Sequence, residues 1–400
     1  MSSRLSSNKV HVLILPSWYP KNPRDISGVF FRDQALALSV YGHKVGVVAP
    51  ELRSLRTLVT NLKNIVKPKF ELDENVPTYR GSGYVYLPKL PYGSYWSFKK
   101  LAKMLIKKYI VEQGCPDIIH AHSAIFAGAV AAELSDELQI PFVVTEHSTG
   151  FARKLYTPWQ MKLAKRAFAQ ASTCIAVSPE LGKLLDNQIA SVDVQWVWIP
   201  NVVAERFQTT VVHNKKNKPI RFLNLALMTE KKGQLDLLQA FKLCVDQGLQ
   251  AELWFGGDGA MREKLEQNAL DLGVSKHVRF LGMVEPDNVP KLLERVDVLV
   301  VPSHYETFGV VAAEALMVGV PVIATRCGGP ECIVTEKDGM LVAIKQPQEL
   351  SLAMIQLSQN IDMYNPDEIS TFAKERFSGL AVAEQLTKVY QQVLSDHINN

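Results

Sequence analysis

The chain lacks a long apolar run, although 47% of its 400 residues are hydrophobic. No stretch approaches the roughly 18 residues that a membrane span needs, and the apolar stretch 10–15 is too short for the core of a signal peptide. These absences point away from a membrane-spanning or secreted protein. We expect a globular chain of two or three domains, with residues 10–15 as its first strand.

Cysteine is scarce, and the five present are Cys115, Cys174, Cys244, Cys327 and Cys332. Their spacing contains no pair typical of a metal site, and reduced thiols are the ordinary state of cysteine in the cytosol. We therefore expect a cytoplasmic protein with no zinc site and no other bound metal.

A large net charge is also missing, because the sequence carries only +4. The charge is uneven: residues 1–200 hold 24 Lys and Arg against 15 Asp and Glu, and the remainder holds 20 against 25. A basic N-terminal half suits an anionic partner, such as inner-leaflet phospholipid or a lipid-linked phosphate, which would make the protein peripheral to the membrane. The alternative is a chance excess of solvated lysines. We expect no nucleic-acid partner.

The stretch 96–109 concentrates this basic character. Leu101, Met104, Leu105 and Tyr109 recur at helical spacing with lysines elsewhere, which predicts a basic amphipathic helix. One interpretation is that this helix touches an anionic membrane. The other is that its apolar face packs on the core of its own domain.

Apolar strands alternate with helical stretches along the chain, which predicts an α/β fold. A small-residue helix is expected over 123–138, and Ser178 is expected to be the N-cap of a helix that runs through Leu185. Residues 201–219 are polar and poor in strand signals, so we expect the interdomain linker there.

A strand, a loop and a helix follow one another in the most informative stretch. The apolar run 298–301 predicts a buried strand, and a small-residue helix follows over 310–318, with Thr307 as its expected N-cap. Anionic ligands bind beyond the carboxyl end of a strand in an open parallel sheet, where the helix N-terminus favours negative charge. The residues expected around a bound phosphate are Thr307, Phe308, Gly309 and Val310.

Two carboxylates flank this phosphate position, Glu306 in the loop and Glu314 about two turns into the helix. A nucleotide sugar carries sugar hydroxyl groups on one side of its diphosphate and ribose hydroxyl groups on the other, so it suits two acceptors at this separation. The ordinary alternative is two solvated glutamates. The Gly-containing turn between the two residues favours the ligand.

The sequence ETFGVVAAE, followed by Gly319, Pro321 and the Gly328-Gly329 pair, resembles the E-x7-E signature of retaining nucleotide-sugar glycosyltransferases of family four. The resemblance runs from about residue 10 to about residue 390 and is most specific in the C-terminal half. It implies the GT-B fold, in which two Rossmann-like doubly wound domains face each other across a cleft. The expected acceptor-side domain spans 1–205, the expected donor-binding domain spans 206–378, and a final helix in 379–400 returns to the first domain.

The resemblance implies three catalytic residues: Glu306, which would orient the donor sugar, and two further side chains. It also implies that Glu314 holds the ribose. Lys232 matches the lysine that pairs with the donor diphosphate, and His147 matches a sugar-facing histidine at the end of a strand. A lone histidine is more often structural, and its place at a strand end favours function here. The family commonly carries an arginine where this chain has Ala226 or Leu227, so either Lys231 compensates or catalysis depends on one cation.

Three further residues are expected to bind the donor. The resemblance places Gly28 against the diphosphate and Met283 beside the base, and Gly257 fits a loop bordering the nucleotide. A glycine in a loop is more often only a turn residue. His120 and His122 also end a strand, and we expect both to be structural.

These features predict a retaining enzyme that moves a hexose-type sugar from a nucleotide-diphosphate sugar to a glycan or lipid-linked acceptor. By analogy with bacterial members of the family, its expected setting is surface-polysaccharide assembly, such as that of lipopolysaccharide. No cofactor is expected besides the donor substrate. Two alternatives stay open: a nucleotide-sugar epimerase of the same fold, and a non-catalytic membrane-associated scaffold.

Overall fold

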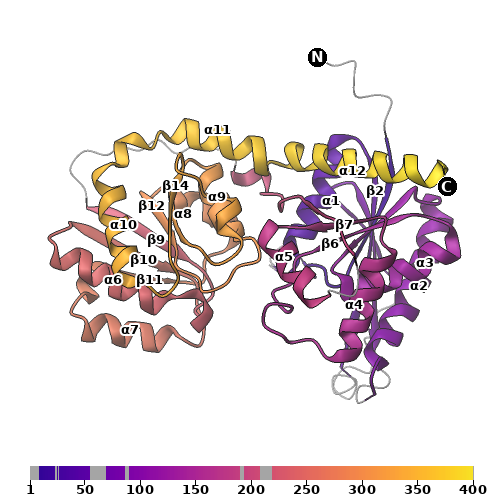
Figure 1. Ribbon diagram of the computed structural model, residues 1–400, viewed down its shortest axis with the longest axis horizontal. Helices are drawn as coiled ribbons and strands as arrows, with labels where there is room; N and C mark the ends of the chain where they lie inside the picture. The colour runs from indigo at the N-terminus through magenta and orange to yellow at the C-terminus, as the bar shows by residue number, and fades with distance from the viewer. Residues whose placement is uncertain are drawn as a thin grey trace. The chain divides into compact units, whose positions relative to one another are not determined.

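The computed structural model describes residues 9–22, 25, 27–54, 69–85, 90–189, 193–207 and 219–399. The chain divides into two compact units (Figure 1): unit 1 contains Met1–Val202 with Gly379–Asn400, and unit 2 contains Val203–Ser378. Most of the expected linker, residues 208–218, lies outside the described residues.

Unit 1 is built on a mostly parallel sheet. Its strands are β1 (His11–Pro16), β2 (Lys44–Arg53), β3 (Lys69–Asp73), β4 (Val76–Tyr84), β5 (Ile118–His122), β6 (Phe142–Glu146), β7 (Thr173–Ala176) and β8 (Trp196–Trp198). They lie in the order β3-β4-β2-β1-β5-β6-β7-β8, in which only the β3–β4 pair is antiparallel among the strands described. The helices of this unit are α1 (Val29–Tyr41), α2 (Gly93–Gln113), α3 (Ala129–Leu138), α4 (Pro158–Gln170), α5 (Pro179–Gln188) and α12 (Gly379–Asn399).

The last helix of the chain belongs to the core of unit 1. Strands β1 and β5 are fully buried, as apolar parallel strands covered on both faces must be. Helix α12 lies beside α1 and inserts Val382, Leu386 and Tyr390 into the same hydrophobic cluster as β1 and β2. Burial of these side chains stabilises the return of the chain to its first unit.

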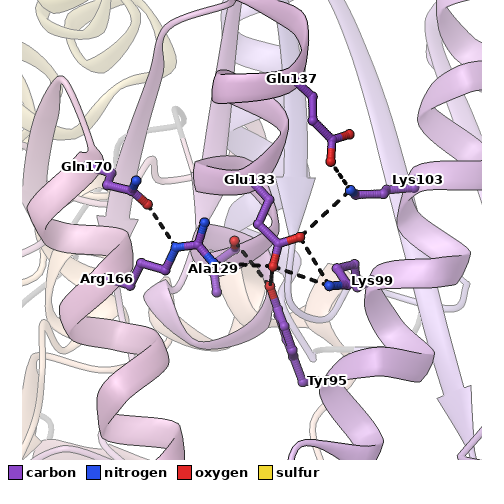
Figure 2. Close-up of polar contacts among 8 residues, drawn as sticks. All are labelled: Tyr95, Lys99, Lys103, Ala129, Glu133, Glu137, Arg166 and Gln170. Atoms are coloured by element: carbon purple, nitrogen blue, oxygen red, sulfur yellow. Dashed lines mark hydrogen bonds and ion pairs between the residues drawn. The ribbon is translucent and has the colours of Figure 1, made fainter.

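Helix α2 includes the basic stretch 96–109, and most of its apolar face is buried. Leu101 and Tyr109 are 8% and 1% exposed, and Lys99 forms an ion pair with Glu133 of α3 at 3.2 Å (Figure 2). Leu101, Leu105 and Tyr109 therefore pack on the core of unit 1, whereas Met104 is 47% exposed. The interpretation in which this apolar face as a whole touches a membrane is wrong. No helix within the described ranges is long and apolar enough to cross a membrane.

The prediction of one continuous helix over 123–138 is wrong for its first third. After β5 the chain makes an irregular turn over Ala124–Gly128, and α3 begins only at Ala129. Ser123 and Phe126 both have a φ of 71°, a value that L-residues rarely adopt and that interrupts a right-handed helix.

Unit 2 contains a second sheet, which is parallel throughout its described strands. The strands are β9 (Ile220–Leu225), β10 (Ala251–Gly256), β11 (Val278–Gly282), β12 (Val298–Val301), β13 (Val322–Thr325) and β14 (Gly339–Val342), in the order β11-β10-β9-β12-β13-β14. Its helices are α6 (Gln234–Asp246), α7 (Arg262–Asp271), α8 (Val289–Leu293), α9 (Val310–Met317), α10 (Pro347–Gln359) and α11 (Pro366–Phe377). The order of the strands along the chain reverses between β9 and β12, and ligands of doubly wound folds bind beyond the strands at such a point.

Candidate active site

Two loops meet at the carboxyl edge of the unit 2 sheet, because β9 and β12 are neighbouring strands. A Cβ atom added to Gly233, in the loop after β9, would stand 2.0 Å from the carbonyl oxygen of Pro302, in the loop after β12. Gly233 also has a φ of 67°, in the left-handed region. Glycine is therefore required for the two loops to come this close.

The contact between these loops brings Lys232 and Glu306 together. The Lys232 Nζ donates to Oε1 of Glu306 at 2.5 Å, and the Ser303 hydroxyl donates to the same oxygen at 2.7 Å. The Lys232 and Glu306 side chains are 19% and 11% exposed. The site thus presents a cation and a carboxylate that are largely desolvated, which strengthens their interaction with a charged ligand.

The main chain of Glu306 is held by the loop after β13. Glu306 forms a bridge with Gly328, and the Gly329 N–H donates to the Glu306 carbonyl oxygen at 2.9 Å. A Cβ atom on Gly328, whose φ is 119°, would approach that carbonyl oxygen to 2.7 Å. The pair of glycines after β13 therefore fixes the position of the Glu306 loop.

Helix α9 begins at Val310 and not at the expected N-cap. Its N-cap is Gly309, with a φ of 95°, so the prediction that Thr307 caps the helix is wrong. Gly309 explains the difference, because a residue in the left-handed region cannot belong to a right-handed helix, so α9 starts after it. The preceding Phe308 ring is 1% exposed and packs edge-on against Phe377, with 5.9 Å between ring centroids. The first N–H groups of α9 have no partner within the helix and form the positive end of its dipole, which can bind an anion.

Glu314 lies in the second turn of α9 and is half-buried. It is on the helix whose N-terminus adjoins the Glu306 loop, so one short segment carries both carboxylates. The structure therefore groups Glu306, Lys232 and the α9 N-terminus. The expected roles of these groups toward a ligand stay predictions.

Two polar residues at this edge escaped the sequence reasoning. The His304 Nε2 lies 2.7 Å from Oδ2 of Asp236, and the His304 N–H donates to the Lys231 carbonyl oxygen at 2.8 Å. These bonds tie the loop after β12 to the loop after β9. The sequence contains one signal that could have pointed to Asp236: it follows Lys232 by four residues, about one helical turn.

Gly257 and Met283 lie farther along the same sheet edge. The Gly257 N–H donates to the Gly282 carbonyl oxygen at 2.8 Å, and a Cβ atom on Gly257 would stand 2.0 Å from the carbonyl oxygen of Ala226. Close packing of two loops therefore accounts for this glycine. Met283 is 61% exposed, just after β11. Contacts of either residue with a nucleotide stay predictions.

His147 and Gly28 lie in unit 1. The His147 ring is buried, with Nε2 at 3.0 Å from Nδ1 of His122 and Nδ1 at 3.0 Å from Oδ1 of Asn201. Burial lowers the pKa of His147 to about 3, so the ring is neutral. Both of its nitrogens are engaged within unit 1. Gly28 caps α1 with a φ of 76°, and a Cβ atom there would stand 2.9 Å from Cδ1 of Trp18.

His120 and His122 are core residues, as expected. His120 is fully buried, and its two nitrogens lie 2.6 Å from the Tyr390 hydroxyl and 2.7 Å from the Thr145 hydroxyl. These bonds join β5 to α12 and β6. The histidines at the ends of β5 and β6 thus form one buried polar cluster.

Two family descriptions match the chain in tandem. "Glycosyltransferase Family 4" matches residues 27–205, and "Glycosyl transferases group 1" matches residues 205–374. The chain belongs to the family-four glycosyltransferases. The putative teichuronic acid biosynthesis glycosyltransferase TuaC of Bacillus subtilis is a curated relative, 27% identical over 96% of this chain and 98% of its own length.

Solved structures show the same fold. Sucrose-phosphate synthase from Thermosynechococcus elongatus matches with a TM-score of 0.75 and 20% identity, over 96% of this chain and 100% of that chain. HepE from Anabaena, in complex with UDP, matches with a TM-score of 0.69 and 18% identity over the same shares. The expected GT-B architecture of two Rossmann-like doubly wound domains is confirmed.

This glycosyltransferase has an apolar side chain at one of the positions where the family commonly carries an arginine. Leu227 is 51% exposed. Lys232 is the cation that the structure pairs with Glu306. Among the residues that the structure describes, no three His, Cys, Asp or Glu side chains come together as a metal site.

Proposed function

We propose that this glycosyltransferase moves a hexose-type sugar from a nucleotide-diphosphate sugar to a glycan or lipid-linked acceptor, with retention at the anomeric carbon. The observation that carries the proposal is the Lys232–Glu306 pair beside the N-terminus of α9. HepE, which has the same fold, was solved with UDP and with UDP-glucose. These complexes support a nucleotide sugar as the donor.

The charges of the site suit a departing diphosphate. The Lys232 ammonium group and the free N–H groups of α9 stabilise the negative charge that builds on the leaving phosphate. In the structure Glu306 holds this lysine. A donor diphosphate competes for the same cation, and the carboxylate then accepts hydrogen bonds from the donor sugar. Glu314 holds the ribose hydroxyl groups.

Retention requires the new bond to form on the face from which the diphosphate leaves. The bond between the anomeric carbon and the phosphate oxygen breaks, and the acceptor oxygen bonds to the same carbon from the same side. The leaving phosphate oxygen takes the proton of the acceptor hydroxyl. This step needs no side-chain nucleophile, and the cation and the helix terminus neutralise the phosphate without a metal ion. Activity should therefore persist in EDTA.

The proposed setting is bacterial surface-polysaccharide assembly at the inner face of the membrane, which the teichuronic acid role in the name of TuaC supports. The membrane contact would use the exposed side of α2. Lys100, Met104 and Lys107 recur there at helical spacing and are exposed. The ammonium groups of Lys100 and Lys107 suit anionic headgroups.

A panel of nucleotide sugars, scored by thermal shift and then by donor hydrolysis, tests the proposal. One nucleotide sugar should raise the melting temperature and should be hydrolysed slowly to nucleoside diphosphate and free sugar. Analysis of the products formed without acceptor distinguishes the proposed transferase from an epimerase, because an epimerase would release an epimeric nucleotide sugar. The absence of any shift across the panel would contradict the proposal.

A further inference from the structure

Unit 1 contains a pocket of about 710 Å³ at the carboxyl edge of its sheet. It is formed by the loop after β1, the last residues of β2, part of β4, and the side chains of Phe98 and Phe126. Pockets of this size bind small ligands such as one or two sugar rings. All of its lining residues belong to unit 1, whereas Lys232 and Glu306 belong to unit 2.

Aromatic side chains, among them Trp18, Phe98 and Phe126, line part of the pocket. Trp18 is 37% exposed, and Phe126 packs on Phe98 with 5.5 Å between nearly parallel rings. Phe126 sits in the irregular turn after β5, where its φ of 71° and ψ of −76° are strained. The Ser17 hydroxyl donates to the carbonyl oxygen of Ile125 at 2.6 Å and so anchors this turn. The fold therefore holds Phe126 in place before a ligand binds, which lowers the entropy cost of binding.

The pocket also has polar lining residues, and one group of them is centred on Glu51. Lys21 lies 3.0 Å and Arg53 lies 3.6 Å from the Glu51 carboxylate, and the Ser82 hydroxyl donates to it at 3.1 Å. Burial acts to raise the pKa of Glu51, but the hydrogen bonds and charges of these neighbours lower it overall. Glu51 is therefore ionised at neutral pH.

A second group of polar lining residues is centred on Glu71. Lys69 pairs with this carboxylate at 3.1 Å, and the Arg80 guanidinium group forms a shorter ion pair with it. Here too burial acts to raise the pKa of Glu71, and the two cations lower it overall. Arg80 also donates to the carbonyl oxygen of Pro20 at 2.6 Å and lies over the Tyr19 ring.

The ion pairs among the lining residues indicate which class of ligand the pocket can bind. Each of its four cations, Lys21, Arg53, Lys69 and Arg80, faces a carboxylate. A phosphate would have to compete with Glu51 and Glu71 for these cations and would be repelled by both. A sugar hydroxyl both donates and accepts hydrogen bonds, so it fits between a carboxylate and a cation without disturbing the pair.

We propose that this pocket binds an uncharged sugar ring of the acceptor, with the ring face on Trp18 and the hydroxyl groups on the Glu51 and Glu71 networks. The assignment to the acceptor rests on the proposed function. The recognition chemistry excludes a phosphate or a uronic acid as the group held in this pocket. A lipid-linked acceptor would therefore place its sugar here and its phosphate elsewhere.

Isothermal titration with methyl glycosides of glucose, galactose, mannose and N-acetylglucosamine, and with the matching sugar 6-phosphates, tests the proposal. At least one neutral glycoside should bind, more tightly than its 6-phosphate, with an affinity that salt leaves unchanged. Trp18→Ala should weaken this binding about tenfold, whereas Trp198→Ala, at a comparably exposed tryptophan outside the pocket (41% against 37%), should not. Binding of the phosphates alone, or of neither class, overturns the proposal.

Glu51→Gln gives a test that keeps the shape of the pocket. Lys21 and Arg53 then lose their anionic partner, so the affinity for the 6-phosphate should rise roughly fivefold and should fall with added salt. Unchanged 6-phosphate binding in this variant contradicts the charge argument. In Lys232→Ala the neutral glycoside should bind as in the wild type. This variant tests the pocket independently of donor binding. A failure of the proposed function would appear in a different measurement, as loss of nucleotide-sugar binding.

Discussion

Acidification should destabilise unit 1 through its buried histidine cluster. Burial lowers the pKa of His120 and of His147 to about 3, and it lowers that of His122 well below its ordinary value of 6.5. The unfolded chain takes up protons at these histidines below pH 6.5, whereas the folded unit does not. Stability is therefore complete above pH 6.5 and is lost as the pH falls.

The size of the effect follows from the unfolded pKa. Each histidine that stays neutral in the fold removes about 1.4 kcal/mol of stability per pH unit below 6.5, or roughly 2 kcal/mol at pH 5. His120 and His147 together remove about 4 kcal/mol, and His122 acts in the same direction. Glu146 opposes them in part, because burial raises its pKa and the folded state then gains from protonation. The net change is a large fraction of the stability of an ordinary domain.

Urea unfolding with pulse proteolysis at pH 7.5, 6 and 5 measures this effect, because peptides from β5 and β12 report separately on the two units. His120→Asn should reduce the loss of unit 1 stability between pH 7.5 and pH 5 by about 2 kcal/mol. The control His277→Asn, at an exposed position in unit 2, should leave that loss unchanged. An equal pH dependence in His120→Asn and wild type would show that His120 does not cause the loss of stability in acid.

Three further outcomes are expected. Glu314→Ala should raise the KM for the donor about tenfold with little change in kcat, because one ribose contact is lost; an equal fall in kcat would contradict this role. Gly233→Ala should destabilise unit 2 by about 3 kcal/mol in urea unfolding, whereas the control Gly248→Ala, which is equally left-handed but has nothing within 4 Å, should lose only about 1 kcal/mol. In co-sedimentation the protein should bind anionic vesicles more than neutral ones, and Lys100→Glu with Lys107→Glu should remove the difference; equal binding to both vesicles would argue against the membrane contact.

The sequence predicted elements well where the signal is local. Ser178 does cap α5, because its hydroxyl accepts from the Leu181 N–H three residues on. Thr307 does not cap α9, because Gly309 has a φ of 95° and the helix begins after it, while the ring of Phe308 packs on a distant residue, Phe377. A single sequence records the first kind of contact in its spacing and leaves no trace of the second.

The candidate site was predicted residue by residue and not as an arrangement. Lys232 and Glu306 were each named from their own motif, but their contact depends on β9 and β12 being adjacent strands. His147 was expected to face the sugar, and in the fold its ring nitrogens bond to His122 and Asn201. Such pairings arise from topology, which residue type and spacing do not encode.

In the proposed reaction Lys232 acts on the donor diphosphate and Glu306 acts on the donor sugar. Steady-state turnover of the nucleotide sugar found in the panel, measured in Lys232→Ala and Glu306→Gln, tests both roles. As a control, Lys242→Ala breaks only the surface pair with Asp246. We expect kcat to fall about a hundredfold or more in the first two variants and to stay unchanged in the control. Melting temperatures should show that both variants are folded. Turnover at the wild-type rate in folded Lys232→Ala would contradict the role proposed for Lys232.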